Sequence, residues 1–228
     1  MPGIFITGTD TGVGKTLIGA ALAFALRQKG RKVGVFKPVE TGAGMDANFL
    51  KIAAGLTQVP LETVRLYHFP TPVSPCLAAR LANQPIDVRR IVDHFNNLQN
   101  EYDFVIVEGA GGLLAPLTDD LLMADLIKLL NLPLVVVARP TLGTINHTLL
   151  TITCAEKIYS LSVTGFIINY PAKVQEGPAE KTNAQEIERI SQKPCLGVVP
   201  YLGYISSRIV NEQQLQQAAQ HLKVDALT

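Results

Sequence analysis

The feature that most constrains the fold of this chain is a glycine-rich segment near its N-terminus. Residues 6–16 read ITGTDTGVGKT, after a short apolar run from Gly3 and before a helix-forming stretch from Leu17. Glycines let backbone N–H groups close around phosphate oxygens, and the N-terminus of the following helix adds a positive dipole. In such a loop Lys15 reaches the β- and γ-phosphates, and the Thr16 hydroxyl binds magnesium. The segment therefore predicts a strand, a phosphate-binding loop and a helix in succession.

The spacing within this loop is unusual. The common phosphate-binding motif places four residues between its first glycine and its Gly-Lys-Thr ending. Here five residues separate Gly8 from Gly14. The alternative is a glycine-rich turn between a strand and a helix that binds no ligand. The strand before the loop and the helix after it favour the phosphate site, so we expect ATP or GTP to bind.

Size and charge limit the remaining possibilities. The 228 residues contain no Pro- or Ser-rich linker, repeat or low-complexity tract, so we expect one domain over residues 1–228. A net charge of +1 gives no electrostatic reason to expect nucleic acid or an anionic membrane as a partner. The three cysteines lack metal-ligand spacing, and we expect reduced thiols. With no signal peptide before the first strand and no bilayer-length apolar run, we expect a cytoplasmic protein.

Strand-length apolar runs alternate with longer helical patterns along the chain. The strand candidates are 3–7, 33–37, 104–108, 134–138, 163–169 and 196–199. The helical patterns cover 15–29, 46–54, 88–97, 121–130, 146–159, 179–191 and 211–221. The strand candidates are almost continuously apolar, which is typical of parallel strands buried on both faces. This alternation predicts a doubly wound, mainly parallel, Rossmann-like α/β sheet with helices on both faces.

Ligands of such sheets bind at the carboxyl ends of the strands, where the chain places several polar residues. Lys37 ends the second expected strand, and Thr41 follows it. Alone, Lys37 would be read as a surface lysine, but beside a phosphate loop it can neutralise a transferring phosphoryl group. Glu108 ends the third strand, before the small residues 109–112, and either holds magnesium or caps a loop. Asp46 is either the N-cap of the next helix or a second magnesium ligand.

No pattern in the sequence indicates a nucleophilic residue. There is no Ser-His-Asp or Cys-His arrangement, and the four histidines lie far apart. The expected site instead contains two lysines, hydroxyls, carboxylates for a metal, and phosphate-binding backbone. This set suits phosphoryl transfer to an acceptor that is already nucleophilic, because positioning and charge stabilisation supply most of the catalysis.

Four motifs follow one another in an order that matches a known family. They are GTDTGVGKT (8–16) with its five-residue spacing, KPV (37–39), EGAGG (108–112) and LGTINH (142–147). Together they resemble the dethiobiotin synthetases, the ATP-dependent carboxylase and cyclase of biotin biosynthesis, over nearly the whole chain. That family belongs to a P-loop NTPase branch shared with the MinD and ParA partition ATPases, which are nucleotide-switched proteins and form the alternative. Partition ATPases carry a signature lysine four residues before the second loop glycine, where this chain has Asp10.

The resemblance implies a defined reaction. 7,8-Diaminononanoate takes up CO2 as a carbamate, ATP phosphorylates the carbamate to a carbamic-phosphoric anhydride, and the second amine closes the ureido ring of dethiobiotin. It also implies ATP as co-substrate, Mg2+ as cofactor and no covalent enzyme intermediate. By resemblance Lys15 and Lys37 are the catalytic residues, and Thr16, Asp46 and Glu108 hold the magnesium.

Ligand contacts are implied by the same resemblance. Thr41 hydrogen-bonds the carbamate, and Asn169 reads the adenine. The implied substrate-binding residues are Thr11, Thr41, Gly143, Thr144, Ile145 and Asn146. The implied ATP-binding residues are Gly12, Val13, Gly14, Lys15, Thr16, Leu17, Asp46, Glu108, Gly109, Ala110, Gly111, Asn169, Tyr170, Pro200, Tyr201 and Leu202.

The resemblance further implies a homodimer with its active site at the subunit interface. The turn formed by residues 143–146 of one subunit binds the carboxylate of the substrate tail for the other. A turn that opens a helix can bind an anion without an arginine. Cys76 stands where the family commonly has a histidine, and we read it as a packing residue.

Overall fold

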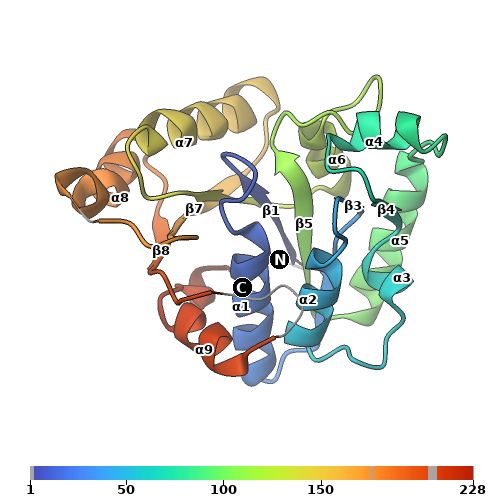
Figure 1. Ribbon diagram of the computed structural model, residues 1–228, viewed down its shortest axis with the longest axis horizontal. Helices are drawn as coiled ribbons and strands as arrows, with labels where there is room; N and C mark the ends of the chain where they lie inside the picture. The colour runs from blue at the N-terminus through green and yellow to red at the C-terminus, as the bar shows by residue number, and fades with distance from the viewer. Residues whose placement is uncertain (1–2, 176, 205–209, 228) are drawn as a thin grey trace.

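The computed structural model describes residues 3–175, 177–204 and 210–227. A six-stranded sheet in the order β2-β5-β1-β6-β7-β8 lies beside a two-stranded sheet of β3 and β4 (Figure 1). The strands are β1 (Gly3–Gly8), β2 (Val33–Phe36), β3 (Val39–Thr41), β4 (Tyr67–Phe69), β5 (Phe104–Gly112), β6 (Leu134–Ala138), β7 (Val163–Asn169) and β8 (Cys195–Val199). All pairings between these strands are parallel. The predicted doubly wound α/β fold is confirmed.

Helices cover both faces of the large sheet. They are α1 (Lys15–Gln28), α2 (Asp46–Ala53), α3 (Leu61–Val64), α4 (Pro75–Leu81), α5 (Val88–Glu101), α6 (Met123–Leu130), α7 (Thr144–Thr153), α8 (Pro178–Ser191) and α9 (Glu212–Gln220). A π-helical turn, Cys154–Ile158, continues α7, and a 3₁₀ turn spans Val224–Leu227. Within the described ranges, no helix is long and apolar enough to cross a bilayer.

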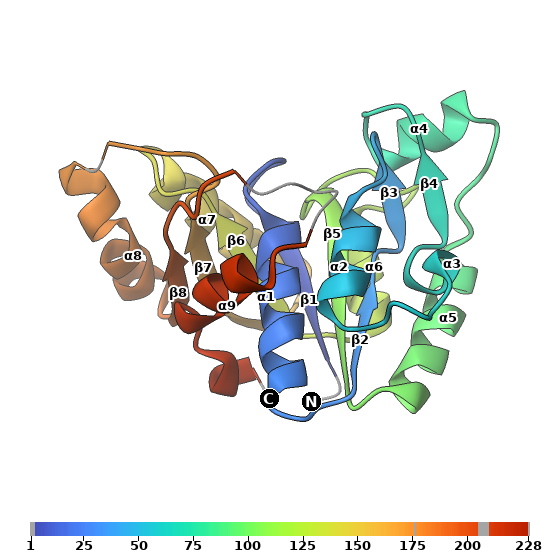
Figure 2. The ribbon, with the colours of Figure 1, turned by 60° about the horizontal axis from the view of Figure 1, so that its bottom comes forward.

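Successive residues of each strand pack against opposite helical layers, as the pleat of a strand requires. In β1, Ile4 and Ile6 belong to one core with α1, α2 and α9. Phe5, between them, belongs to a second core with α5 and α6. Figures 1 and 2 show α1 on the first face, between α9 and α2. Burial on both sides explains why the strands are continuously apolar in sequence.

The central position of β1 places the phosphate loop at the middle of the sheet's carboxyl edge. From β1 the chain crosses to β2, returns through β5, and then continues through β6 on the other side of β1. The strand order therefore reverses beside β1, and ligands of open α/β sheets bind at such a reversal. The fold directs the expected site residues to this edge.

Several boundaries differ from the sequence-based expectation. β2 ends at Phe36, so Lys37 lies just beyond the strand, and β5 continues through the glycines to Gly112. Helix α7 begins at Thr144, because Gly143 in the left-handed region starts it two residues earlier than periodicity indicates. The sequence did not predict the short elements β3, β4, α3 and α4. β3 and β4 have only three residues each, and α3 and α4 do not complete two helical turns, so none of the four leaves a clear pattern in the sequence.

Candidate active site

The phosphate loop is hydrogen-bonded to Asn169, the last residue of β7. Gly14 has a φ of 93°, which favours glycine. A Cβ atom at this position would also lie 2.1 Å from Nδ2 of Asn169. That same Nδ2 donates a hydrogen bond of 2.9 Å to the carbonyl of Val13, while Oδ1 of Asn169 is buried without a partner among the described residues. Gly14 is therefore required both by backbone conformation and by the close approach of Asn169.

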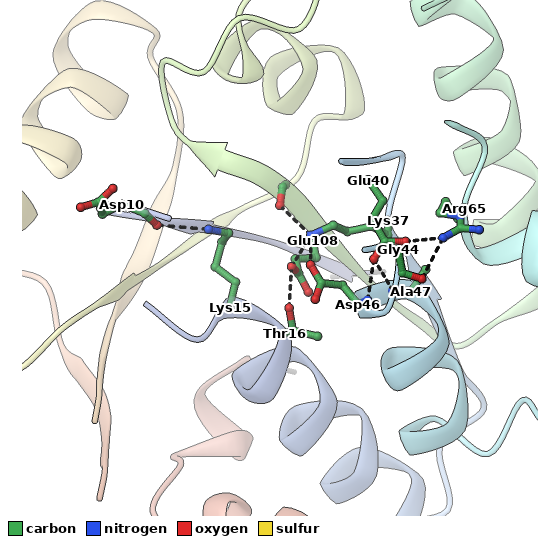
Figure 3. Close-up of polar contacts among 11 residues, drawn as sticks. Asp10, Lys15, Thr16, Lys37, Glu40, Gly44, Asp46, Ala47, Arg65 and Glu108 are labelled. Atoms are coloured by element: carbon green, nitrogen blue, oxygen red, sulfur yellow. Dashed lines mark hydrogen bonds and ion pairs between the residues drawn. The ribbon is translucent and has the colours of Figure 1, made fainter. Parts of the chain in front are cut away.

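Lys15 and Thr16 begin α1, as predicted (Figure 3). The buried Lys15 side chain folds back over the loop, where Nζ donates to the carbonyl of Asp10 at 3.2 Å. Burial lowers the pKa of Lys15, and the nearby Glu108 carboxylate only partly opposes this. The Thr16 hydroxyl donates to Oε1 of Glu108 at 3.0 Å. Both side chains thus lie where a phosphate bound in the loop would meet them.

Lys37 and Glu108 form a buried ion pair, with exposed fractions of 3% and 1%. Nζ of Lys37 also donates to Oδ2 of Asp46 at 3.2 Å and to the carbonyl of Gly109 at 3.3 Å. Burial acts to lower the pKa of Lys37, but the carboxylates of Glu108 and Asp46 raise it by more. Lys37 is therefore held as an ammonium ion, so it is not the surface lysine of the alternative interpretation.

The carboxylates beside Lys37 have the composition of a magnesium site. Oε2 of Glu108 is buried without a partner in the described part of the chain, and the Thr16 hydroxyl lies against Oε1. Among the described residues, no group of three or more His, Cys, Asp or Glu side chains could hold a metal ion by itself. Magnesium in phosphoryl-transfer sites needs only one or two carboxylates, because phosphates and waters complete its coordination. The oxygens of Thr16, Asp46 and Glu108 fit that requirement.

Asp46 is not the N-cap of α2, which corrects one of the two interpretations of this residue. The N-cap is Met45, and it provides no side-chain hydrogen bond. Instead, the backbone N–H groups of Asp46 and Ala47 donate to Oε1 of Glu40. The Asp46 side chain is left to pair with Lys37. Sequence reasoning missed Glu40, because a cap from another element leaves no local pattern.

Three cavities lie at the carboxyl edge of the sheet and share lining residues. The central one, of about 240 Å³, collects the loop and its polar neighbours: Thr11, Gly12, Gly14, Lys15, Thr16, Lys37, Thr41, Asp46, Glu108, Ala110 and Gly111. A second cavity of about 300 Å³ shares Gly14, Thr16 and Asp46 with it. A third, of about 810 Å³, shares Thr11, Thr41 and Gly111. The phosphate region is therefore continuous with a cavity on either side.

The second cavity contains most of the residues expected to bind a base. Its lining includes Leu17, Asn169, Tyr170, Tyr201 and Leu202, together with Phe49, which was not predicted. The sequence did not indicate Phe49 as a site residue, because an apolar side chain within a helical pattern indicates only a core position. Pro200 is exposed and is not among the described lining residues of this cavity.

The turn at residues 143–146 does not join these cavities. Gly143, with a φ of 93°, begins α7, while Thr144 is buried and its hydroxyl has no partner among the described residues. Ile145 is half-buried and Asn146 is exposed. The part of α7 and its continuation that lines the third cavity is Leu150, Thr151 and Cys154. Cys76 is buried and its thiol lies 3.3 Å from Oδ1 of Asp119, away from the phosphate loop.

Comparison with known proteins gives the family. The AAA domain family matches residues 2–208 of the chain. The ATP-dependent dethiobiotin synthetase BioD of Thermodesulfovibrio yellowstonii is 39% identical, over 94% of this chain and 95% of that protein. The chain belongs to the dethiobiotin synthetase family. The synthetases BioD of Bacillus cereus and Bacillus subtilis are 40% and 38% identical, over 100% of this chain and 93% and 97% of theirs.

Solved structures support the fold of this dethiobiotin synthetase family member. The cell division ATPase MinD of Pyrococcus furiosus has a TM-score of 0.58 at 17% identity, over 96% of this chain and 98% of that one. MinD of Pyrococcus horikoshii, complexed with Mg-ADP, also has a TM-score of 0.58, at 19% identity over 98% and 94%. At such identities the likeness concerns the P-loop fold alone.

Proposed function

We propose that this chain catalyses the ATP-dependent carboxylation and ring closure of 7,8-diaminononanoate to dethiobiotin, a late step of biotin biosynthesis. The observation that carries the proposal is the order of the three connected cavities. ATP with its base in the second cavity and its phosphates in the central one directs the γ-phosphate toward the third. The third cavity is large enough for a small-molecule acceptor. The names of the relatives give ATP and the product, dethiobiotin, and the diamine acceptor is the one that the family resemblance implies.

The reaction needs no nucleophile from the protein. One amine of the substrate attacks CO2 and loses a proton, which forms the carbamate. A carbamate oxygen then attacks the γ-phosphorus and ADP leaves. The second amine attacks the carbamoyl carbon, so that the second C–N bond closes the ring and phosphate leaves. Each step transfers charge onto oxygens that fixed cations can stabilise.

In this proposal Lys15 and Lys37 are the catalytic cations. Lys15 stabilises the β- and γ-phosphates, and Lys37 stabilises charge shared by the γ-phosphate and the carbamate. Support comes from the ammonium of Lys37, which is held by Glu108 in the lining of the central cavity. Thr41 lines both of these cavities and donates its hydroxyl to the carbamate. Thr11 lines them too and contacts the same substrate.

We assign the magnesium ligands to Thr16, Asp46 and Glu108. Oε2 of Glu108, which is buried without a partner among the described residues, supports this assignment, since an unpaired buried carboxylate oxygen is otherwise costly. When bound, magnesium neutralises charge on the β- and γ-phosphates during transfer. The three side chains orient the ion relative to the loop, and Lys37 then pairs with substrate oxygens.

The remaining ATP contacts follow the same cavities. Asn169 binds the adenine through Oδ1, which has no partner in the described part of the chain, while its Nδ2 stays hydrogen-bonded to Val13 of the loop. The proposed phosphate contacts are the loop residues Gly12, Val13 and Gly14 and the strand-end residues Gly109, Ala110 and Gly111. The proposed base contacts are Leu17, Tyr170, Tyr201 and Leu202, with Pro200 at the margin.

A homodimer completes the site in this proposal. The turn from Gly143 to Asn146 lies outside the cavities of its own chain, so its anion-binding end is available to the substrate of a second copy. Leu142 just before α7, Leu150 on α7 and Ile158 at the end of its π-helical continuation are exposed. Exposed apolar side chains gathered on one segment are costly in water and suit contact with a second subunit.

We also propose a single domain over residues 1–228, because strands from both halves of the chain share one sheet. Small molecules are its substrates, and no nucleic acid or membrane partner is proposed. A net charge of +1 supports this view. The three cysteines are free thiols, which supports a reducing compartment, the cytoplasm.

The second candidate function is a nucleotide-switched ATPase of the partition type. The fold it would need is the one this chain shares with MinD. Against it stands Asp10, an acid that pairs with Arg139 of the same chain at 3.1 Å, where partition ATPases carry a lysine. An acid at this position cannot supply a cation to a phosphate, so the ligase is favoured.

The deciding experiment measures phosphate release from Mg-ATP with and without 7,8-diaminononanoate and bicarbonate, and identifies the product by mass. Release that requires both additions and yields a cyclic urea is the expected result. ATP hydrolysis indifferent to the diamine would contradict the ligase and favour the switch.

A further inference from the structure

The short strand β3 presents its side chains to two different parts of the site. Thr41 lines the central and third cavities. Glu40, the preceding residue, points to the opposite side of the strand, as the pleat requires. It is almost completely buried against the start of α2. One residue step therefore separates the substrate side of this strand from the helix that carries Asp46.

Both carboxylate oxygens of Glu40 are engaged (Figure 3). Oε1 accepts from the backbone N–H groups of Asp46 and Ala47, the first two residues of α2. Oε2 accepts from Nη1 of Arg65 at 2.6 Å, and the same guanidinium nitrogen donates to the carbonyl of Gly44 at 3.1 Å. Arg65 thus neutralises Glu40 and also fastens the loop that leads into α2.

The N-terminus of α2 depends on this carboxylate. The first N–H groups of a helix have no partner within it, and the N-cap Met45 provides none. Glu40 satisfies two of them and places negative charge at the positive end of the helix dipole. Among the described residues, the Asp46 side chain forms an ion pair with Lys37 alone. Its backbone position is therefore determined largely by Glu40.

We propose that Glu40 is a positioning residue that aligns Asp46 for magnesium, with Arg65 orienting Glu40. This inference rests on the proposed role of Asp46 in the site described above. Because Glu40 and Thr41 are adjacent on β3, the same strand aligns the metal ligand and the carbamate contact. Mutation of a residue that orients a metal ligand commonly lowers metal affinity about 10- to 100-fold.

A matched pair of substitutions separates positioning from simple packing. Glu40→Gln keeps an oxygen that accepts from Asp46 and Ala47, whereas Glu40→Met has similar volume and no strong acceptor. Glu40→Ala is a second variant without an acceptor, and it leaves room for water at the two amides. Asp87→Ala is the control, because Asp87 caps α5, a helix on the other face of the sheet, by accepting from Arg90 N.

The experiment uses two readouts that do not require turnover. Amide-resolved hydrogen exchange is measured on the metal-free protein, and Mn2+ binding is measured by electron paramagnetic resonance in the presence of ADP. We expect Glu40→Met and Glu40→Ala to speed exchange at Asp46 and Ala47 and to weaken Mn2+ binding about tenfold. Glu40→Gln should recover most of the affinity, and Asp87→Ala should leave it at the native value.

Two results would overturn the proposal, and they are distinguishable. If Glu40→Met and Glu40→Ala speed exchange but Mn2+ affinity stays native, Glu40 is a helix cap without a role at the metal. If Asp46→Ala leaves Mn2+ affinity unchanged, Asp46 is not a ligand. In that case the metal assignment of the proposed function fails, and the positioning role fails with it.

Discussion

Lys37 and Glu108 form an ion pair that joins the residue just after β2 to the middle of the neighbouring strand β5. Both side chains are almost fully buried, and Asp46 adds a second carboxylate to the same ammonium. Because removing two charges from water costs free energy, a buried ion pair adds little net stability to the fold. Removing one partner is nevertheless destabilising, since it leaves an uncompensated buried charge. The pair is better understood as a cation and an anion held ready for a ligand that brings both phosphates and magnesium.

Lys37→Leu should abolish turnover and spare nucleotide binding. The variant loses the cation that we assign to the γ-phosphate and carbamate, so we expect the rate of dethiobiotin formation to fall about 10³-fold or more. ADP should still bind, because the loop and Lys15 are intact. Steady-state kinetics and calorimetric ADP titration check both parts. Full activity in this variant would remove Lys37 from the mechanism.

The same variant should acquire a distinctive pH dependence of stability without magnesium. Burial raises the pKa of Glu108, and the ammonium of Lys37 opposes the rise. Without Lys37, folded Glu108 binds its proton more readily than unfolded Glu108, so stability falls as pH rises above the ordinary glutamate range. Relative to the native protein, Lys37→Leu should lose about 3–5 kcal/mol at neutral pH and less near pH 5. Urea denaturation at several pH values measures this, and a pH-independent loss would contradict it.

Glu108→Ala should weaken the magnesium dependence of catalysis. The variant removes the oxygen that we assign to the ion, so the magnesium concentration for half-maximal rate should rise about tenfold or more. Glu212→Ala is the matched control, because Glu212 is an exposed acid paired with Arg27 away from the site. A magnesium titration of both variants is the measurement. An unchanged midpoint in Glu108→Ala would reassign this acid to structure.

Gly14→Ala should damage the phosphate loop more than Gly12→Ala. Both positions have positive φ, 93° and 74°, so each substitution costs about 1–2 kcal/mol of backbone strain. At Gly14 the new methyl group also meets Nδ2 of Asn169 at 2.1 Å, whereas at Gly12 no atom of a described residue lies within 4 Å of it. ADP affinity and thermal stability should therefore fall further in Gly14→Ala. Equal losses would show that the Asn169 contact is unimportant.

Leu150→Glu should convert the proposed dimer to monomers. Leu150 is 61% exposed on α7 and lies in the proposed subunit contact. A buried carboxylate in an apolar interface is costly, so the subunits should separate. Leu129→Glu is the control, since Leu129 is 53% exposed on α6, outside the segment 142–158 that carries the proposed subunit contact. Sedimentation velocity gives the masses, and a native protein that is already monomeric would contradict the dimer.

Much of this architecture is readable from local patterns. The continuous apolar runs predicted all six strands of the large sheet, and the loop from Gly8 to Thr16 predicted the junction of β1 and α1. The helix expected over 15–29 is α1, Lys15–Gln28. These features are readable locally. A strand buried on both faces appears in the sequence as a continuous apolar run, and the conformational freedom of a glycine is a property of that residue alone.

The short elements and the capping of α2 were not readable. β3 and β4 have three residues each, and their pairing depends on a partner 28 positions away. The N-cap interpretation of Asp46 was wrong, because Glu40 reaches the helix from β3 with a separation of six residues. A local capping pattern could not indicate this, since the acceptor belongs to another element.

By itself the sequence determined that this chain forms a parallel α/β sheet with a phosphate loop at its first strand. It also carried enough family identity to indicate the substrates. Only the tertiary structure decided how the charged residues are paired. Lys37 meets Glu108 across 71 positions, and Asn169 meets Val13 across 156. The physical reason is that strand order and helix crossovers bring distant residues to one sheet edge, where burial then makes their charges and hydrogen bonds interdependent.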